Sequence, residues 1–258
     1  MHIVVLMNAV PVVGTQRLEA DFRTQRVQLE ANGNDEYLLE KALKLTEAHG
    51  GEVSLLTVGP GPAIDGLRKA LAMGATRAYQ VVDAALAGSC VRVTVDVLAA
   101  ALRRIDFDLA FSGADTSDGL GGVVGAALAA RLGLPYLSYA SDIVPSADGT
   151  RVTVHRLVPG GHDVLEAATP ALVMGTQMLG EPRYPTLRGI MAARSREIVS
   201  WSLADLGIPA ANVGKAASTT HVLSTQSPPQ RGAATVLRGS PAEAVQQVVD
   251  FLVARRLI

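Results

Sequence analysis

Residues 109–132 read LAFSGADTSDGLGGVVGAALAARL, and this stretch contains the repeating unit of the fold. A short apolar strand opens into a glycine-rich loop, and an alanine-rich helix follows. The same alternation runs through the first 180 residues. Further strands are expected at 2–7, 53–58, 78–82, 152–157 and 172–175. Regular alternation of strand and helix predicts an α/β fold with a doubly wound, mostly parallel sheet of the Rossmann-like kind.

Helices are expected between these strands, and two of them end at glycines that can serve as C-caps. They cover about 36–50, 64–74 and 90–104, and Ser89 is expected to cap the third. The segment 15–31 carries mixed charges and weak strand signals, so a hairpin over the sheet edge is expected there.

The glycine-rich loop over 113–122 is the best candidate for a small-molecule site, because ligands bind at the carboxyl ends of parallel strands. Glycines let the backbone approach a ligand, and the following helix can receive a phosphate on its N–H groups. The loop matches neither a GxGxxG fingerprint nor a P-loop, and it contains no lysine, so phosphoryl transfer is not expected. The alternative is a turn whose glycines only pack the helix tightly on the sheet.

Composition excludes several classes of function. Of the 258 residues 48% are hydrophobic and 18% charged, which supports a substantial core. A net charge of -1 and an aromatic content of 4% disfavour nucleic acid as a partner. The lone Cys90 and five scattered histidines give no disulfide framework, metal site or catalytic triad. With no apolar run of bilayer length and no signal peptide, we expect a cytoplasmic protein without membrane insertion.

Residues 181–194 read EPRYPTLRGIMAAR. Two prolines three positions apart predict a stiff corner, and a short helix is expected from Thr186. Leu187, Ile190 and Met191 share one face of that helix, among arginines. Such a corner suits a docking surface, although the spacing alone also fits an amphipathic turn packed on its own domain.

The last part of the chain is less regular. A strand is expected over 197–201, and the small residues of 209–218 are expected to be extended. Ser240, Pro241 and Glu243 form a capping box that predicts a helix to about residue 256. Its apolar stripe, which includes Val245, requires another surface, so the segment either folds back or wraps around a partner.

The EPRYP corner and the leucine before its GIM motif resemble the signature of the electron-transfer flavoprotein beta subunit. The NxxDE pattern at 32–36 and the PPQR segment at 228–231 agree with it. The resemblance implies a sheet similar to that of adenine nucleotide alpha hydrolases and universal stress proteins. It also implies an electron carrier without catalytic residues of its own, paired with an alpha subunit that holds most of the FAD. Acyl-CoA or other flavin dehydrogenases, as in fatty acid beta-oxidation, would supply electrons, and a downstream quinone oxidoreductase would accept them.

The resemblance also implies roles for individual residues. A structural AMP would be bound by Leu6, Asn32, Gly33, Asn34, Asp35, Val58, Gly113, Asp115, Asp118, Gly119, Gly121, Gly122, Val123 and Val124. Val13 and Asn34 would lie near the flavin, and partner recognition would fall to Arg183, Tyr184, Leu187, Ile190 and Met191. Many relatives have Gln-Thr where this chain has Val123-Val124, so a phosphate would rest here on backbone amides alone.

The expected organisation is a nucleotide-binding body over 1–180, a partner-recognition segment over 181–197 and a C-terminal arm over 198–258 that packs on the alpha subunit. One alternative is a bifurcating type of beta subunit, with a second FAD in place of AMP. Another is a regulatory module resembling universal stress proteins, which would lack both the corner and the arm.

Overall fold

The computed structural model describes residues 1–12, 14, 17–226, 232 and 234–258. Val13 and the PPQR segment at 228–231, two features singled out in the sequence, therefore lie outside the described residues. The chain divides into two compact units, Met1–Val222 and Leu223–Ile258, and each is described by itself.

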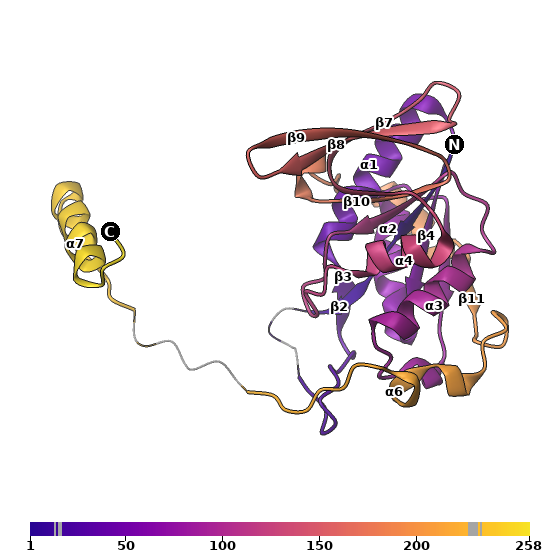
Figure 1. Cartoon of the computed structure of the whole chain (residues 1–258), viewed down its shortest axis with the longest axis horizontal. Coiled ribbons are helices and arrows are strands. Elements are labelled where there is room, and N and C mark those ends of the chain that lie inside the picture. The colour runs from indigo at the N-terminus through magenta and orange to yellow at the C-terminus, as the bar shows by residue number, and fades with distance from the viewer. Residues whose placement is uncertain (13, 15–16, 227–231, 233) are drawn as a thin grey trace. The chain divides into compact units, whose positions relative to one another are not determined.

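A nine-stranded sheet forms the centre of the first unit, in the order β11-β5-β4-β1-β6-β10-β7-β8-β9 (Figure 1). Its strands are β1 (His2–Leu6), β4 (Glu52–Val58), β5 (Arg77–Val81), β6 (Leu109–Gly113), β7 (Tyr136–Pro145), β8 (Arg151–Val158), β9 (Gly161–Ala168), β10 (Ala171–Gly175) and β11 (Ile198–Trp201). All pairings from β11 through β7 are parallel, and β8 and β9 are added antiparallel. The predicted doubly wound, mostly parallel α/β sheet is confirmed.

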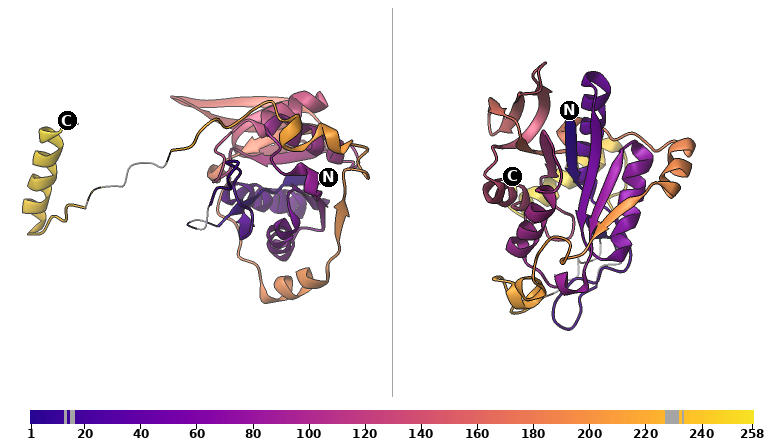
Figure 2. Two further views of the ribbon diagram at one scale, coloured as in Figure 1. Left: turned by 90° about the horizontal axis from the view of Figure 1, so that it is seen from below. Right: turned by 90° about the vertical axis from the view of Figure 1, so that its right-hand side faces the viewer.

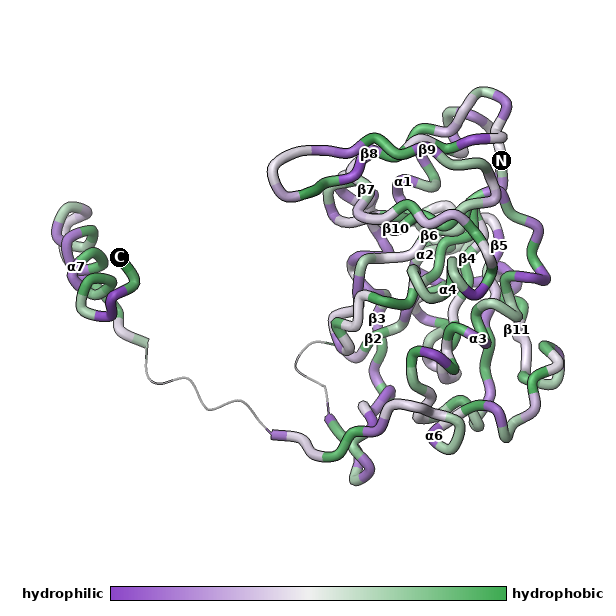
Figure 3. Tube along the Cα trace, viewed as in Figure 1, coloured by the Kyte–Doolittle hydropathy of each residue, from purple (hydrophilic) through white to green (hydrophobic). Residues whose placement is uncertain are grey.

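Helices cover both faces of this sheet, giving three layers (Figure 2). One buried cluster joins the sheet to α1 (Gly33–His49) and α2 (Ile64–Met73), and the other joins it to α3 (Val91–Leu102) and α4 (Val124–Leu132). Side chains of β1 alternate between the two clusters and are buried in both. A central parallel strand is therefore mostly apolar, as the green parts of the tube at β4 and β6 illustrate (Figure 3).

Two of the predicted helix ends are confirmed, and one predicted cap is not. The glycines Gly50 and Gly74 end α1 and α2 with positive φ, as expected. The prediction that Ser89 caps α3 is wrong, because the N-cap is Cys90. The Ser89 hydroxyl instead donates to the carbonyl of Leu86 at 2.7 Å and accepts from the backbone N–H of Gly214 at 3.0 Å.

The antiparallel extension of the sheet was not expected. The turn at Pro159-Gly160 joins β8 to β9, not β8 directly to the strand at 171–175, so β7 and β9 are additional strands. The segment 15–31 does not supply both strands of the expected hairpin. Its strand β3 (Leu29–Ala31) pairs antiparallel with β2 (Ala9–Pro11), which precedes the segment, and an isolated bridge joins Leu18 to Thr24.

The end of the first unit returns to the sheet. Thr186 caps α5 (Leu187–Ser195) by accepting from the N–H of Gly189 at 3.0 Å, and β11 then pairs with β5 at the sheet edge. The segment 209–218, predicted to be extended, instead forms η4 (Ala210–Asn212) and α6 (Gly214–Ala217). The other single turns are η1 (Gly61–Ala63), η2 (Ala84–Leu86) and η3 (Gln177–Leu179).

The second unit contains α7 (Pro241–Ala254), and the predicted capping box is present. The Ser240 hydroxyl accepts from the N–H of Glu243, whose carboxylate accepts from the N–H of Ser240 at 2.7 Å. No residue of α7 is buried, although its stripe of valines is apolar (Figure 3). Within the described part of the chain, no helix is long and apolar enough to cross a membrane.

Candidate functional site

The candidate nucleotide site lies where the strand order reverses. From β1 the sheet grows to β4 and β5 on one side and to β6 on the other, so the ends of β1 and β6 form a topological switch point. Asp35 bridges these two ends. Its carboxylate accepts from the N–H of Asn8, just after β1, at 2.8 Å and from the N–H of Gly113, at the end of β6, at 3.2 Å.

Asp35 is only 4% exposed. Burial raises its pKa to about 7, despite the hydrogen bonds from the backbone that favour the ionised form. Its carboxylate bonds to the N–H groups of Asn8 and Gly113, which belong to other segments of the chain. Asp35 therefore connects two strand ends.

Two asparagines beside Asp35 hold the glycine-rich loop. The Asn32 amide donates to the carbonyl of Asp115 at 2.9 Å, and its oxygen accepts from the N–H of Ser117 at 3.3 Å. Asn34 donates to the carboxylate of Asp115 at 2.6 Å. Asn32 is the N-cap of α1 but makes no capping bond, because its side chain is used on the loop. Five of the predicted site residues are thus brought together: Asn32, Asn34, Asp35, Gly113 and Asp115.

Asp118 does not join this group. Its carboxylate accepts from Arg26 at 2.6 Å, and Arg26 also donates to the carbonyl of Ala9 at 2.6 Å. This ion pair ties the loop to the β2–β3 sheet. Arg26 was not singled out in the sequence, and no signal links it to a residue 92 positions away.

The glycines of the loop divide into two kinds. A Cβ on Gly125 would come within 2.5 Å of the Ser112 hydroxyl, and one on Gly113 within 2.3 Å of the Asp35 carboxylate, so these two permit close packing. A Cβ on Gly121 would meet nothing within 4 Å. Gly122 has a φ of +62°, a left-handed conformation that favours glycine. Gly113 and Gly125 therefore permit close packing, whereas Gly121 lies in open space.

The N-terminus of α4 can accept an anion. Residues 119–123 are exposed, and no side chain caps the helix. The first N–H groups of α4 are therefore available, and the helix dipole favours negative charge there. Val123 and Val124 contribute no hydroxyl to this position. The residues present fit the phosphate of a nucleotide.

The remaining predicted nucleotide contacts belong to the strand ends and α1. Leu6 ends β1 and is 7% exposed, and Val58 ends the neighbouring β4 and is half-buried. Gly33 is the first residue of α1.

The predicted recognition segment packs through small residues and exposes large ones. A Cβ on Gly189 would come within 2.3 Å of the carbonyl of Ala72 on α2, and Ala193 is buried. The large apolar side chains point to solvent, with exposed fractions of 93% for Tyr184, 75% for Leu187, 41% for Ile190 and 64% for Met191. An amphipathic turn that packed on its own domain would bury these residues, whereas a docking surface would expose them.

The arginines of this segment fall into two groups, those that bond to the rest of the first unit and those that are exposed. Arg183 forms ion pairs with Glu40 and Glu47 of α1, and Arg196 donates to the carbonyl of Ala75 at 2.8 Å. Arg188 and Arg194 are exposed and form no ion pair among the described residues. Arg183 and Arg196 therefore hold the segment in place. Glu40 was not singled out in the sequence. It lies between Leu39 and Ala42, which are both buried, and an acidic residue in such a place requires a basic partner.

Metal binding has little support in the described residues. No group of three or more His, Cys, Asp and Glu lies close enough there to hold a metal ion. Cys90 is half-buried at the start of α3. Burial acts to raise its pKa, but hydrogen bonds from Val93, Thr219 and Ser218 outweigh burial and lower the pKa to about 6.

The comparisons with known proteins agree with this architecture. The family model of the Electron transfer flavoprotein domain matches residues 21–206. "Electron transfer flavoprotein subunit beta" of Mycobacterium leprae is 35% identical, over 100% of this chain and 99% of the relative. The protein of that name from Megasphaera elsdenii is 37% identical, over 88% of this chain and 87% of the relative. "Caffeyl-CoA reductase-Etf complex subunit CarD" of Acetobacterium woodii is 33% identical, over 99% and 97%. This chain therefore belongs to the electron transfer flavoprotein family, among its beta subunits.

Proposed function

We propose that the chain forms a heterodimer with an electron-transfer flavoprotein alpha subunit and carries electrons on an FAD held mainly by that partner. The observation that supports this most strongly is the match to proteins named beta subunits over the whole chain. Flavin dehydrogenases, including those that act on acyl-CoA, would donate the electrons, and a quinone oxidoreductase would accept them. Such a carrier would work in the cytoplasm.

Under this proposal the beta subunit supplies binding surfaces only. The FAD provides the redox chemistry when it is bound, and Asn34 would lie near it. The second unit, with its exposed apolar stripe on α7, would pack on the alpha subunit, as the arm expected over 198–258. The exposed Leu187 and its neighbours would bind the donor dehydrogenase.

The nucleotide at the switch point is proposed to be AMP. The free N–H groups at the start of α4 are suited to one phosphate group, and Asn32, Asn34 and Asp35 hold the loop that encloses the site. The second candidate is the bifurcating type with a second FAD. Its support is the pair Val123 and Val124, which stands where many relatives have Gln-Thr, so that the threonine hydroxyl is missing from the phosphate seat.

The purified heterodimer distinguishes these candidates. The chain would be co-expressed with the alpha subunit of the same organism, and nucleotides released by acid would be quantified by chromatography. We expect equal amounts of the two subunits, one FAD and one AMP. Two FAD and no AMP would establish the bifurcating type. A chain that binds an adenine nucleotide but no alpha subunit would be a regulatory module instead.

A further inference from the structure

The corner that precedes α5 has no secondary structure of its own to hold it. Residues 180–186 lie in neither helix nor strand. Pro182 and Pro185 fix their φ angles, but proline has no N–H with which to attach the backbone to a neighbour. Gly180 before the corner has a φ of +107°, so rigidity within the corner does not determine its direction. Contacts with another element must therefore orient it.

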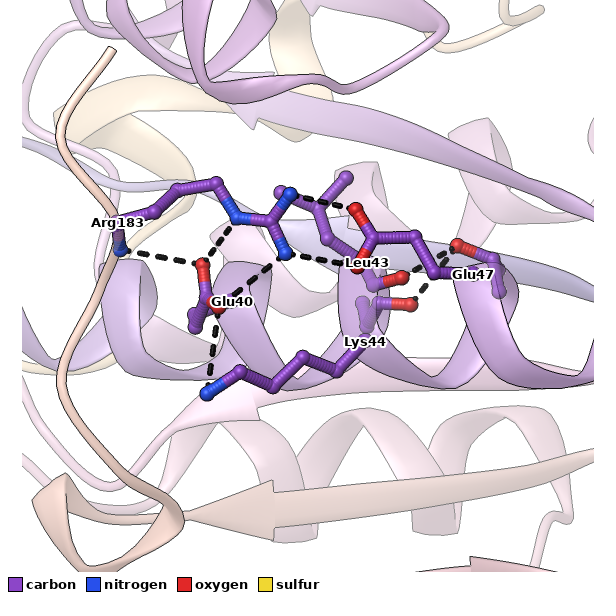
Figure 4. A network of polar contacts seen from close by, with 7 residues as sticks. Glu40, Leu43, Lys44, Glu47 and Arg183 are labelled. Carbon is purple, nitrogen blue, oxygen red and sulfur yellow. Dashed lines mark hydrogen bonds and ion pairs between the residues drawn. The ribbon is translucent and has the colours of Figure 1, made fainter.

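Glu40 of α1 makes these contacts (Figure 4). Its Oε2 accepts from the backbone N–H of Arg183 at 3.1 Å and from Nε of the same residue at 2.7 Å. Its Oε1 accepts from the Arg183 Nη2 at 3.2 Å, and Lys44 lies 3.3 Å away. Glu40 is 3% exposed, so one buried carboxylate fixes both the backbone and the side chain at the centre of the corner.

Glu47 holds only the outer side of the same guanidinium. Its carboxylate accepts from Nη1 of Arg183 at 2.5 Å and from Nη2 at 3.0 Å, and it is exposed (Figure 4). Hydrogen bonds with Glu47 and Glu40 raise the pKa of Arg183. Burial acts to raise the pKa of Glu40, but the bonds from Arg183 and Lys44 outweigh it and lower the pKa. Glu40, Glu47 and Arg183 therefore favour their charged forms.

We infer that Glu40 is a positioning residue for electron-donor docking, which acts through Arg183 to orient the corner so that Tyr184 and Leu187 face the partner. The inference rests on the proposed docking role of Leu187. Arg183 then contributes to recognition by fixing the corner, and its guanidinium makes no bond to the partner. The far end of α5 is held separately, since Arg68 donates to the carbonyls of Ala193 at 2.6 Å and Arg196 at 2.5 Å. Loss of Glu40 should thus free the corner and the first turn of α5, where Leu187 lies, and leave the C-terminal end of α5 on α2.

The test uses the heterodimer and an acyl-CoA dehydrogenase purified from the same organism. Glu40→Gln, with nearly the same shape, is compared with the matched Glu47→Gln, which leaves the backbone contact in place. We expect Glu40→Gln to raise the KM of the dehydrogenase for the carrier between about threefold and thirtyfold, the upper bound being the loss of the anchor itself. We expect Glu47→Gln to change KM by less than about twofold, as for other exposed pairs. The kcat and the flavin spectrum should stay unchanged in both.

A second comparison separates positioning from general destabilisation. If Glu40 acts only through presentation of Leu187, Glu40→Gln should have almost no further effect on KM in a Leu187→Ala background. Should Glu40→Gln fold poorly, Arg183→Lys replaces it, since lysine keeps the charge but cannot bond to both carboxylates in a fork. An unchanged KM, or the same rise in both backgrounds, would overturn the inference. If Leu187→Ala alone leaves KM unchanged, the docking proposal is wrong and this inference falls with it.

Discussion

Replacing Leu187 with alanine should weaken docking of the electron donor without weakening the fold. Leu187 is 75% exposed and is the first residue of α5, so truncation removes little buried area and places a good helix former in the helix. The free energy of unfolding should change by less than about 0.5 kcal/mol. If the side chain fills a pocket on the dehydrogenase, its loss costs about 2 kcal/mol of binding, or roughly thirtyfold in affinity.

The assay is reduction of the heterodimer's flavin at increasing carrier concentration, with acyl-CoA dehydrogenase as the donor. The matched control is Val164→Ala, which truncates a side chain that is 62% exposed on β9, outside the proposed docking surface. We expect KM to rise in Leu187→Ala alone, while the melting temperature and the flavin content stay equal in all proteins. If Leu187→Ala instead loses flavin or unfolds, and reduction per bound flavin is unaffected, the residue is part of the core and the docking proposal is refuted.

Three further predictions concern the nucleotide site and the arm. Asp35 has a pKa of about 7 in the folded protein and 3.8 ordinarily, so its contribution to stability is complete below the lower value and is lost as pH rises through the higher one. Between pH 4 and pH 8 the free energy of unfolding should therefore fall by on the order of 4 kcal/mol through this group. Asp35→Asn should flatten the pH dependence of the urea midpoint. Parallel pH profiles for the two proteins would contradict the raised pKa of Asp35. Asn32→Ala removes both bonds to the glycine-rich loop, so AMP should be lost on gel filtration while FAD is retained; retention of AMP would show that the loop holds without them. Deletion of 232–258 should leave the first unit folded by circular dichroism but abolish co-purification with the alpha subunit, and undiminished co-purification would exclude the arm as the main contact.

The central strands could be predicted because each is buried on both faces and is therefore mostly apolar, despite polar residues such as Ser54 and Thr57 in β4. The antiparallel extension of the sheet was not predicted, because its strands lack this apolar character. Strand β7 carries Ser138 and Ser141 on half-buried positions and Asp142 on an exposed one, and its register is irregular at 140–142, so it lacks a continuous apolar run. Helix α7, predicted to run to about residue 256, ends at Ala254, and it could be predicted this closely because its signals are local.

Features set by distant contacts could not be predicted from local patterns. The segment 209–218 is rich in small residues, but the Ser218 hydroxyl accepts from the N–H of Cys90 at 2.8 Å and donates to the carbonyl of Gly214 at 2.9 Å, which holds the segment as a helical turn. The pairing of Arg183 with Glu40 joins residues 143 positions apart. The family resemblance indicated the exposed leucine, but it did not indicate which carboxylate orients it.

Electron transfer from a dehydrogenase to the flavin of the purified heterodimer tests the central proposal most directly. The oxidised complex would be mixed rapidly with an acyl-CoA dehydrogenase and its substrate, and the flavin absorbance would be followed in time. We predict that the flavin of the heterodimer is reduced at a rate that depends on both proteins, and that a quinone oxidoreductase reoxidises it. A flavin that dithionite reduces, but that stays oxidised with every flavin dehydrogenase of the organism, would contradict a role as their electron carrier.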